Sequence, residues 1–195
     1  DGSEGDAQHA QHAPRSYSLA SLPSHGDLQL LVRQERHAGS ENEGYGICSG
    51  WLTRFAPLGS PIRLRLQANP AFAPALVDVP CIYIGNGSGL AGLRAHLRAR
   101  QRAGLARNWL LFGERQRAFD SVCGEELQGW LNAGHLARLD RVFSRDGDES
   151  GKREYVQDRL RSSTDELRDW LAQGAIVYVC GSLHGMAAGI DAVLQ

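Results

Sequence analysis

Three alternating glycines directly after an apolar run constrain the fold of this chain most strongly. Residues 79–84 (Val-Pro-Cys-Ile-Tyr-Ile) lead into Gly85-Asn86-Gly87-Ser88-Gly89, and a leucine-spaced segment begins at Leu90. This order predicts a strand, a tight turn and a helix. Glycine is needed where φ is positive or where a ligand approaches the backbone closely. A helix starting near Gly89 would direct free N–H groups at an anion. The run therefore favours a phosphate-binding turn, with close packing of strand and helix as the alternative.

The spacing of these glycines also fits a second interpretation. Residues 87–92 (Gly-Ser-Gly-Leu-Ala-Gly) match G-x-G-x-x-G, the Rossmann dinucleotide fingerprint. That fingerprint needs an acidic residue about 20 positions later, and Glu114 is the candidate. Its neighbours Arg115 and Arg117 suit a phosphate better than a free ribose diol. An NAD-linked Rossmann dehydrogenase therefore stays open at this point.

Composition narrows the class of protein. The formal net charge is -1, which gives no electrostatic reason to expect a nucleic-acid or membrane partner. No apolar run reaches transmembrane length, and no signal peptide is recognisable. The four cysteines (Cys48, Cys81, Cys123 and Cys180) contain no C-x-x-C pair. We therefore expect neither a disulfide framework nor a metal site, and we expect a reduced, cytoplasmic location.

The first part of the chain predicts a small β-rich unit. Residues 1–13 are polar and rich in Gly, Ala and Gln, which is typical of a disordered tail. Within residues 14–74, short strands are expected at 14–21 and 27–33, one helix turn follows residue 46, and 61–66 alternates apolar and basic residues as a half-buried strand does. Prolines then mark a linker.

From residue 75 the pattern predicts an α/β domain that continues to residue 195. Strands are expected near 81–84, 108–112, 139–143 and 175–180, with helices near 89–102, 121–133, 154–172 and 185–194. This alternation predicts a doubly wound parallel sheet covered on both faces. A capping box at 163–166 divides the third helical region in two. Arg94, Arg98 and Arg102 are expected on the solvated face of the first helix.

In such a fold, ligands bind at the carboxyl ends of the strands. Ser144-Arg145 and, beyond a loop, residues 152–157 (Lys-Arg-Glu-Tyr-Val-Gln) would meet at one strand end. Cations, a flat ring and hydroxyl or amide groups suit a phosphorylated ribose, which distinguishes NADP from NAD. A solvated loop with incidental charge is the alternative. Cys180 ends the last strand, where a buried core position is the commoner fate of a cysteine and a place at a reaction centre is the alternative.

Seven stretches in order resemble the diflavin branch of the ferredoxin–NADP reductase superfamily, which includes the sulfite reductase flavoprotein. They are Arg15-Ser16-Tyr17-Ser18, residues 46–49, residues 85–91, residues 112–115 with 125–127, residues 142–145, residues 155–160 and residues 178–181. The resemblance implies an NADP(H)-binding domain over 75–195, preceded by a partial antiparallel FAD-binding β-barrel over 14–74. Relative to that family, the chain is expected to be truncated at both ends. Asn86 and Ser88 stand where the family has Pro and Thr, and Ser182 stands where it has an acid.

The resemblance also implies residue roles on the flavin side. Arg15 would hold the FAD diphosphate, Tyr17 would stack on the flavin ring, and Ser18 would hydrogen-bond near its N5 atom. The FAD phosphates would be bound by the turn at Gly46, Ile47, Cys48 and Ser49. Cys180 would border the nicotinamide and, with Ser18, form the catalytic pair.

On the nicotinamide side, the NADPH diphosphate would be bound by Gly85, Gly87, Ser88 and Gly89, helped by Arg115. The 2′-phosphate would be read by Ser144, Arg145, Arg153, Tyr155 and Gln157, with Lys152 as the alternative to Arg153. We therefore expect an NADPH-dependent flavoprotein reductase that passes hydride to FAD and electrons on to an FMN domain, a haem protein or another redox partner. It would be cytoplasmic, or the cytosolic part of a larger or membrane-associated reductase. The alternatives are an NADP(H)-binding fragment without turnover and the NAD-linked dehydrogenase.

Overall fold

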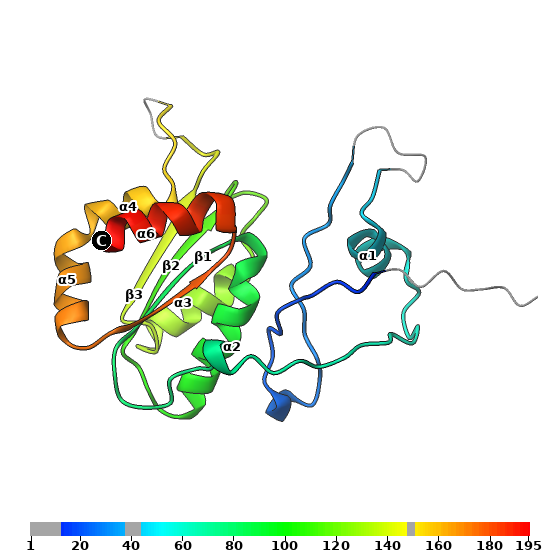
Figure 1. Ribbon diagram of the computed structural model, residues 1–195, viewed down its shortest axis with the longest axis horizontal. Helices are drawn as coiled ribbons and strands as arrows, with labels where there is room; N and C mark the ends of the chain where they lie inside the picture. The colour runs from blue at the N-terminus through cyan, green and yellow to red at the C-terminus, as the bar shows by residue number, and fades with distance from the viewer. Residues whose placement is uncertain (1–12, 38–43, 148–150) are drawn as a thin grey trace, which may run out of the picture.

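The computed structural model describes residues 13–37, 44–147 and 151–195, and Figure 1 shows an α/β domain with an irregular segment beside it. Apart from Ala13, the tail expected at 1–13 lies outside the described residues. The elements of the domain are β1 (Cys81–Asn86), α2 (Leu90–Arg102), β2 (Asn108–Glu114), α3 (Gly124–Asn132), β3 (Arg138–Phe143), α4 (Val156–Ser162), α5 (Thr164–Ala172), β4 (Ile176–Cys180) and α6 (Ala188–Leu194). The α/β alternation predicted from residue 81 onward is confirmed.

The four strands form one parallel sheet in the order β3-β2-β1-β4. Strand β1 lies between its successor β2 and the last strand β4, so the strand order reverses between β1 and β4. Gly85, near the end of β1, is in register with Phe112 on one side and Cys180 on the other. Ligands of open α/β sheets bind outside such a reversal, at the carboxyl ends of the strands. The topology therefore points to the ends of β1 and β4.

Helices cover both faces of the sheet, as the prediction of a doubly wound domain requires. One core joins α2 and α3 to the sheet, with Leu90, Leu93 and Leu97 fully buried against Tyr83. The opposite core joins α4, α5 and α6 to the side chains of β1, β2 and β3 that point the other way. The helices α4 and α5 do meet at the expected place, but the Ser163 hydroxyl accepts from Arg138 and caps no helix.

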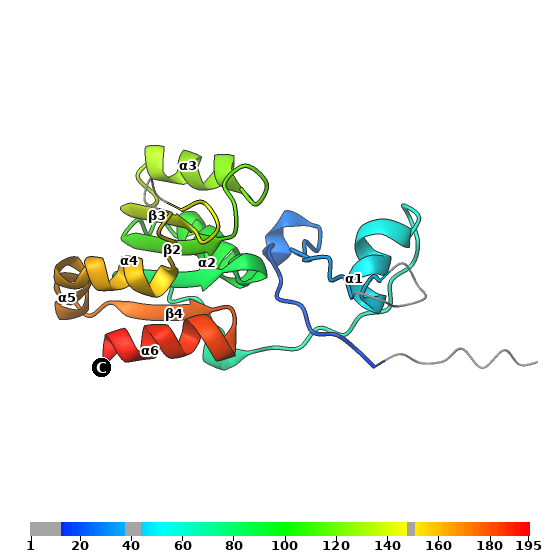
Figure 2. The same cartoon turned by 90° about the horizontal axis from the view of Figure 1, so that it is seen from above.

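Residues 13–37 and 44–74 form a mostly irregular segment to one side of the α/β domain (Figures 1 and 2). Its described part contains a 3₁₀ turn at Pro23–His25, α1 (Ile47–Gly50) and two isolated antiparallel bridges, Leu19 with Leu30 and Arg36 with Tyr45. The alternating residues 61–66 form no strand, and Ile62, Leu64 and Leu66 are 53%, 55% and 68% exposed. Alternation makes a strand possible, whereas pairing requires a second strand beside it. The FAD-binding barrel thus stays a prediction.

A cluster of half-buried charges joins this segment to α2. Arg94 donates to the Ala20 carbonyl and to Gln29 Oε1, both at 2.9 Å, and it pairs with Glu126 of α3 at 2.6 Å. Arg98 binds the same carboxylate at 2.6 Å. The two side chains therefore connect segment and domain and do not form the solvated face that the helix pattern predicted. Within the described ranges, no helix is both long enough and apolar enough to span a membrane.

Candidate functional site

The glycines after β1 are required for different physical reasons. Gly87 has a φ of 55°, which favours glycine. It begins a short 3₁₀ turn, Gly87–Gly89, that continues directly into α2. Gly89 packs on the end of β4, so that a Cβ there would collide with the Cys180 carbonyl oxygen. Gly85 has no room either, because a Cβ would lie 2.7 Å from Leu93 Cδ1. Close packing thus explains Gly85 and Gly89, while Gly87 has the positive φ expected of a tight turn.

A cavity of about 1040 Å³ opens between this turn and the irregular segment. It lies at the strand-order reversal, because its walls include the turn after β1 and the residues that follow β4. Among the predicted site residues, the cavity is lined by Arg15, Tyr17, Ser18, Gly46, Ile47, Cys48, Ser49, Gly87, Ser88, Gly89 and Cys180. Residues far apart in the sequence, including both members of the predicted catalytic pair, therefore share one cavity.

Ser18 and Cys180 are neighbours at the N-terminal end of α2. A Cβ built on Gly92 would lie 3.8 Å from Ser18 Cβ and 3.9 Å from Cys180 Sγ, so both side chains border the same point. Burial raises the pKa of the Cys180 thiol, which keeps the group protonated and argues against a nucleophilic role. The pair is suited to positioning a ligand and to forming neutral hydrogen bonds.

Tyr17 and Ser49 line the wall of the same cavity that the irregular segment forms. Burial and a hydrogen bond with Cys48 raise the pKa of Tyr17 to about 12, so the phenol stays neutral at physiological pH. Ser49 Oγ accepts from the Glu35 N–H at 3.1 Å and retains its own proton for a further acceptor. Arg15 is exposed at this wall. A neutral ring, a hydroxyl donor and a guanidinium fit a phosphate-bearing aromatic cofactor.

Asn86 connects the two loops that flank the strand-order reversal. Its Oδ1 accepts from the Ser182 N–H at 3.3 Å, which joins the end of β1 to the residues that follow β4. Both residues depart from the usual family pattern. In the structure the two departures are connected. Asn86, which stands where the family has Pro, accepts a hydrogen bond from the backbone of Ser182, which stands where the family has an acid.

Glu114 does not serve as the acid that a Rossmann site requires. Its side chain is buried, pairs with Arg141 at 2.7 Å, and accepts from the Val122 N–H at 2.9 Å. Both carboxylate oxygens are therefore engaged in holding β3 and the loop that precedes α3. A ribose diol would have to displace these bonds, which disfavours the NAD-linked Rossmann interpretation.

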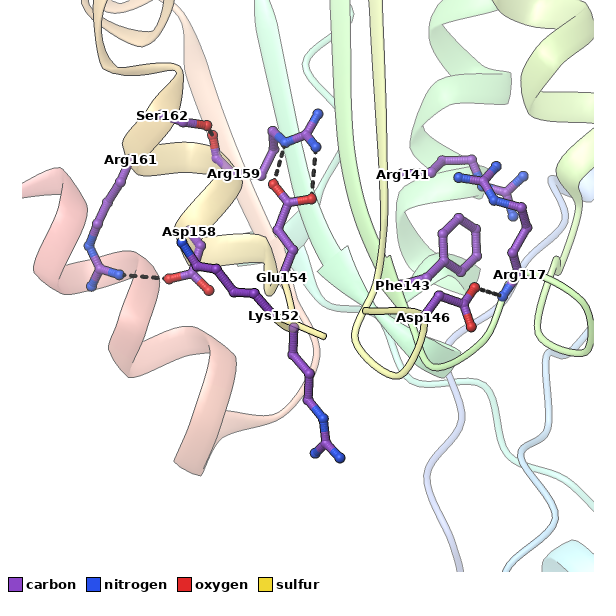
Figure 3. Close-up of a pocket in the computed structure, with 11 residues that line it drawn as sticks. Arg117, Arg141, Phe143, Asp146, Lys152, Glu154, Asp158, Arg159, Arg161 and Ser162 are labelled. Carbon is purple, nitrogen blue, oxygen red and sulfur yellow. Dashed lines mark hydrogen bonds and ion pairs between the residues drawn. The ribbon is translucent and has the colours of Figure 1, made fainter. Parts of the chain in front are cut away.

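A second cavity, of about 1000 Å³, lies beside the ends of β2, β3 and the start of α4 (Figure 3). Its lining has six basic and three acidic residues. Glu154 is held by two 2.7 Å bonds from Arg159, and Asp158 pairs with Arg161 at 3.1 Å. On the opposite wall the guanidinium of Arg117 stacks 4.4 Å above the Phe143 ring. The surplus of positive charge suits a phosphorylated ligand.

The residues predicted to read a 2′-phosphate are only partly brought together. Lys152 and Arg153 line the second cavity, whereas Ser144, Arg145, Tyr155 and Gln157 do not. Ser144 Oγ donates to the Glu114 carbonyl at 3.2 Å, and the Gln157 side chain packs beside Gly189 of α6. Arg145 and Tyr155 are exposed near the two ends of the segment that connects β3 to α4. The choice between Lys152 and Arg153 stays open.

Five arginines that line these cavities are not among the residues predicted from the sequence to bind a cofactor. Arg33 lines the first cavity from the irregular segment, and the second is lined by Arg117, Arg141, Arg159 and Arg161. For Arg117 the sequence does carry a signal, because it follows Arg115 beyond the end of β2 and the pair suits a phosphate. Arg33 and Arg141 lie within stretches that read as ordinary strands, and no local signal distinguishes them. Arg115 itself is exposed and lines neither cavity.

A parallel α/β domain with a glycine turn at its strand-order reversal defines a dinucleotide-binding domain. Residues 83–192 match the family of oxidoreductase NAD-binding domains. This chain belongs to that family.

Curated relatives extend the match to nearly the whole chain. The sulfite reductase [NADPH] flavoprotein alpha-component of Yersinia enterocolitica is 35% identical over 185 residues, which is 93% of this chain and 30% of the relative. The protein of the same name from Vibrio cholerae gives the same identity and coverage. The resemblance to the diflavin branch is thereby confirmed. The chain spans about 30% of the length of these relatives.

Proposed function

We propose that this chain is an NADPH-dependent flavoprotein reductase module that accepts hydride from NADPH on FAD and passes electrons to an FMN domain, a haem protein or another redox partner. The observation that carries the proposal is the cavity of about 1040 Å³ whose lining includes Tyr17 and Ser18 on one side and Gly87–Gly89 with Cys180 on the other. Such a cavity could hold a flavin ring against a nicotinamide. When bound, the two cofactors supply the hydride chemistry.

The chain's own residues would orient these rings and exclude other reactions. Ser18 and Cys180 border the same point beside Gly92, and both would hold the reacting ends of the cofactors. Neutral Tyr17 offers a flat face for stacking. Holding donor and acceptor carbons in contact geometry accounts for a large part of the rate in such transfers.

Preference for NADPH over NADH is also part of the proposal. It is supported by the excess of basic side chains in the second cavity and by the engagement of Glu114 with Arg141 and Val122. A 2′-phosphate is recognised by cations, whereas a free 2′-hydroxyl is recognised by a carboxylate. Arg145, Arg153, Tyr155 and Ser144 would provide this recognition, and Gln157 would support it from α4.

One observation favours the runner-up, an NADP(H)-binding fragment without turnover. The described part of residues 13–74 contains no β-strand, and apolar side chains at 62, 64 and 66 are exposed. A flavin site built on such a segment would be weakly ordered until further strands pair with it.

The two functions are separated by measuring flavin and nucleotide binding on the same purified chain. We expect stoichiometric FAD after reconstitution and desalting, with NADP⁺ binding at least about tenfold tighter than NAD⁺, as a cation-bound phosphate would give. A chain that binds NADP⁺ but releases FAD on desalting is the fragment. A chain that binds NAD⁺ as tightly as NADP⁺ refutes the assignment of a 2′-phosphate site.

A further inference from the structure

Arg33 brings a cation from the irregular segment directly onto the glycine turn. A Cβ built on Gly87 would lie 2.8 Å from Arg33 Nη2, 3.1 Å from its Cζ and 3.3 Å from its Nη1. The guanidinium therefore lies flat against the one residue of the turn that has a positive φ. Both residues line the first cavity. A side chain at position 87 would occupy the space next to the Arg33 guanidinium.

The guanidinium of Arg33 has no hydrogen bond or ion pair within residues 13–37, 44–147 and 151–195. Glu35, two residues on and lining the same cavity, does not pair with it. The arginines of α2 behave differently. Arg94 and Arg98 share the Glu126 carboxylate, and Arg100 donates to an amide and three carbonyl oxygens. Arg33 thus has its five donors available for a ligand in the cavity.

The surroundings favour an anionic ligand at this place. The turn at Gly87–Gly89 runs directly into the 13-residue helix α2, whose first N–H groups and positive dipole end face the same region. A planar guanidinium binds two phosphate oxygens at once more readily than an ammonium does. Arg115, which the family resemblance implies for the diphosphate, lines neither cavity.

We infer that Arg33 binds the diphosphate of the nicotinamide dinucleotide at the Gly87–Gly89 turn. The inference rests on the proposed function and adds a ligand contact from the irregular segment to the α/β domain's own site. The bound dinucleotide then connects the two parts of the chain. Arg33 contacts the part that NADP⁺ and NAD⁺ share and has no role in distinguishing them.

The test is a calorimetric titration of the full chain and its Arg33→Ala variant with NADP⁺, NAD⁺ and 2′-AMP, which lacks the diphosphate. We expect Arg33→Ala to raise the Kd for NADP⁺ and NAD⁺ by the same factor, about tenfold, and to leave the Kd for 2′-AMP unchanged. Arg33→Lys should recover part of the loss, because it keeps the charge without the fork. Arg63→Ala removes an equal charge from an exposed position outside both cavities and should change none of the three.

Several results would overturn the inference. Arg33→Ala with an unchanged Kd for NADP⁺ would do so, and so would a loss for 2′-AMP equal to that for NADP⁺. Weaker FAD binding with unaltered NADP⁺ binding would assign Arg33 to the flavin. A wild-type chain that binds neither nicotinamide dinucleotide would refute the proposed function and this inference with it. Melting curves of Arg33→Ala and Arg63→Ala exclude loss of folding as the cause, and Arg33→Lys replaces Arg33→Ala if the latter is unfolded.

Discussion

At Gly89 the chain has room for a hydrogen atom and nothing larger, because the Cys180 carbonyl oxygen packs against it. Gly89→Ala would push the start of α2 away from the end of β4. We expect the free energy of unfolding in urea to fall by about 2 kcal/mol, as overpacking of a tight contact costs. NADP⁺ binding should weaken as well, because the turn would shift.

Gly129→Ala is the matched control for that variant. Gly129 lies inside α3 with no heavy atom near its Cβ position. Alanine there should raise the free energy of unfolding by about 0.5–1 kcal/mol, since glycine is a poor helix former. A Gly89→Ala chain as stable as the wild type would contradict the packing described for the turn.

Single variants, beginning with Arg145→Ala, test which residues recognise the 2′-phosphate. Arg145→Ala is expected to raise the Kd for NADPH about tenfold and to leave the Kd for NADH nearly unchanged, because only NADPH carries the phosphate. The same titration of Arg153→Ala and of Lys152→Ala decides which of the two neighbours contributes. Arg168→Ala on α5, whose exposed side chain lines neither cavity, should affect neither nucleotide. An unaltered preference in Arg145→Ala would remove that residue from the site.

Among single residues, the sequence predicts those that belong to a short local motif. The glycine turn, Cys180 and Arg15 to Ser18 can be assigned from short motifs, and they meet in one cavity. Arg33 could not be assigned, since its position depends on contact with Gly87, more than fifty residues later. Arg115 is the reverse case. A motif match predicts that it helps to bind the NADPH diphosphate, yet it does not line the cavity beside the glycine turn.

Among the elements, the linker before β1 is bonded by two buried side chains, Tyr178 of β4 and Arg100 of α2. Arg100 is fully buried on α2 and donates to the carbonyl oxygens of Ala75, Val77 and Val79 and to Asn108 Oδ1, at 2.6–3.2 Å. Arg100→Met would leave these acceptors without a donor. We expect a loss of about 3 kcal/mol or more in the free energy of unfolding.

Arg102→Met provides the comparison, because Arg102 is exposed and bonds only Ser24 Oγ among the described residues. Its effect should stay within about 0.5 kcal/mol. Chemical denaturation of both variants checks the difference. Equal effects would mean that the buried hydrogen bonds of Arg100 do not stabilise the linker.

The elements of the α/β domain were predictable because each has its own pattern of apolar residues in the sequence. Leucines spaced for a helix mark α2, and continuous apolar runs mark β1 and β2. Elements that depend on a distant partner were not predictable. The alternating residues 61–66 have a strand pattern but no neighbouring strand, and Ser163 of the capping box bonds Arg138 of β3 instead of its own helix.

For the molecule as a whole, two buried histidines link stability to pH. Burial lowers the pKa values of His96 and His135 in the folded state. Nε2 of each ring lies within 3.0 Å of a carbonyl oxygen, at Phe72 and Leu97 respectively. The unfolded chain, in which a histidine has a pKa of about 6.5, therefore binds more protons as the pH falls below that value.

The stability that these histidines contribute is complete above about pH 6.5 and is lost as the pH falls toward their folded-state pKa values. We expect the melting temperature to fall between pH 7.5 and 5.5, with up to about 1.4 kcal/mol lost per pH unit for each histidine. Replacing both with glutamine should flatten this dependence. A melting temperature that does not change over that range would contradict the buried, neutral state of the rings.

We propose that one cavity, shared by the irregular segment and the α/β domain, holds a flavin against NADPH. The most direct measurement is the visible absorbance of the FAD-loaded chain under anaerobic conditions, before and after stoichiometric NADPH. We expect the flavin band to bleach, faster with NADPH than with NADH, because hydride passes to the bound flavin. A flavin band that persists, on a chain shown to bind both FAD and NADP⁺, would contradict the account.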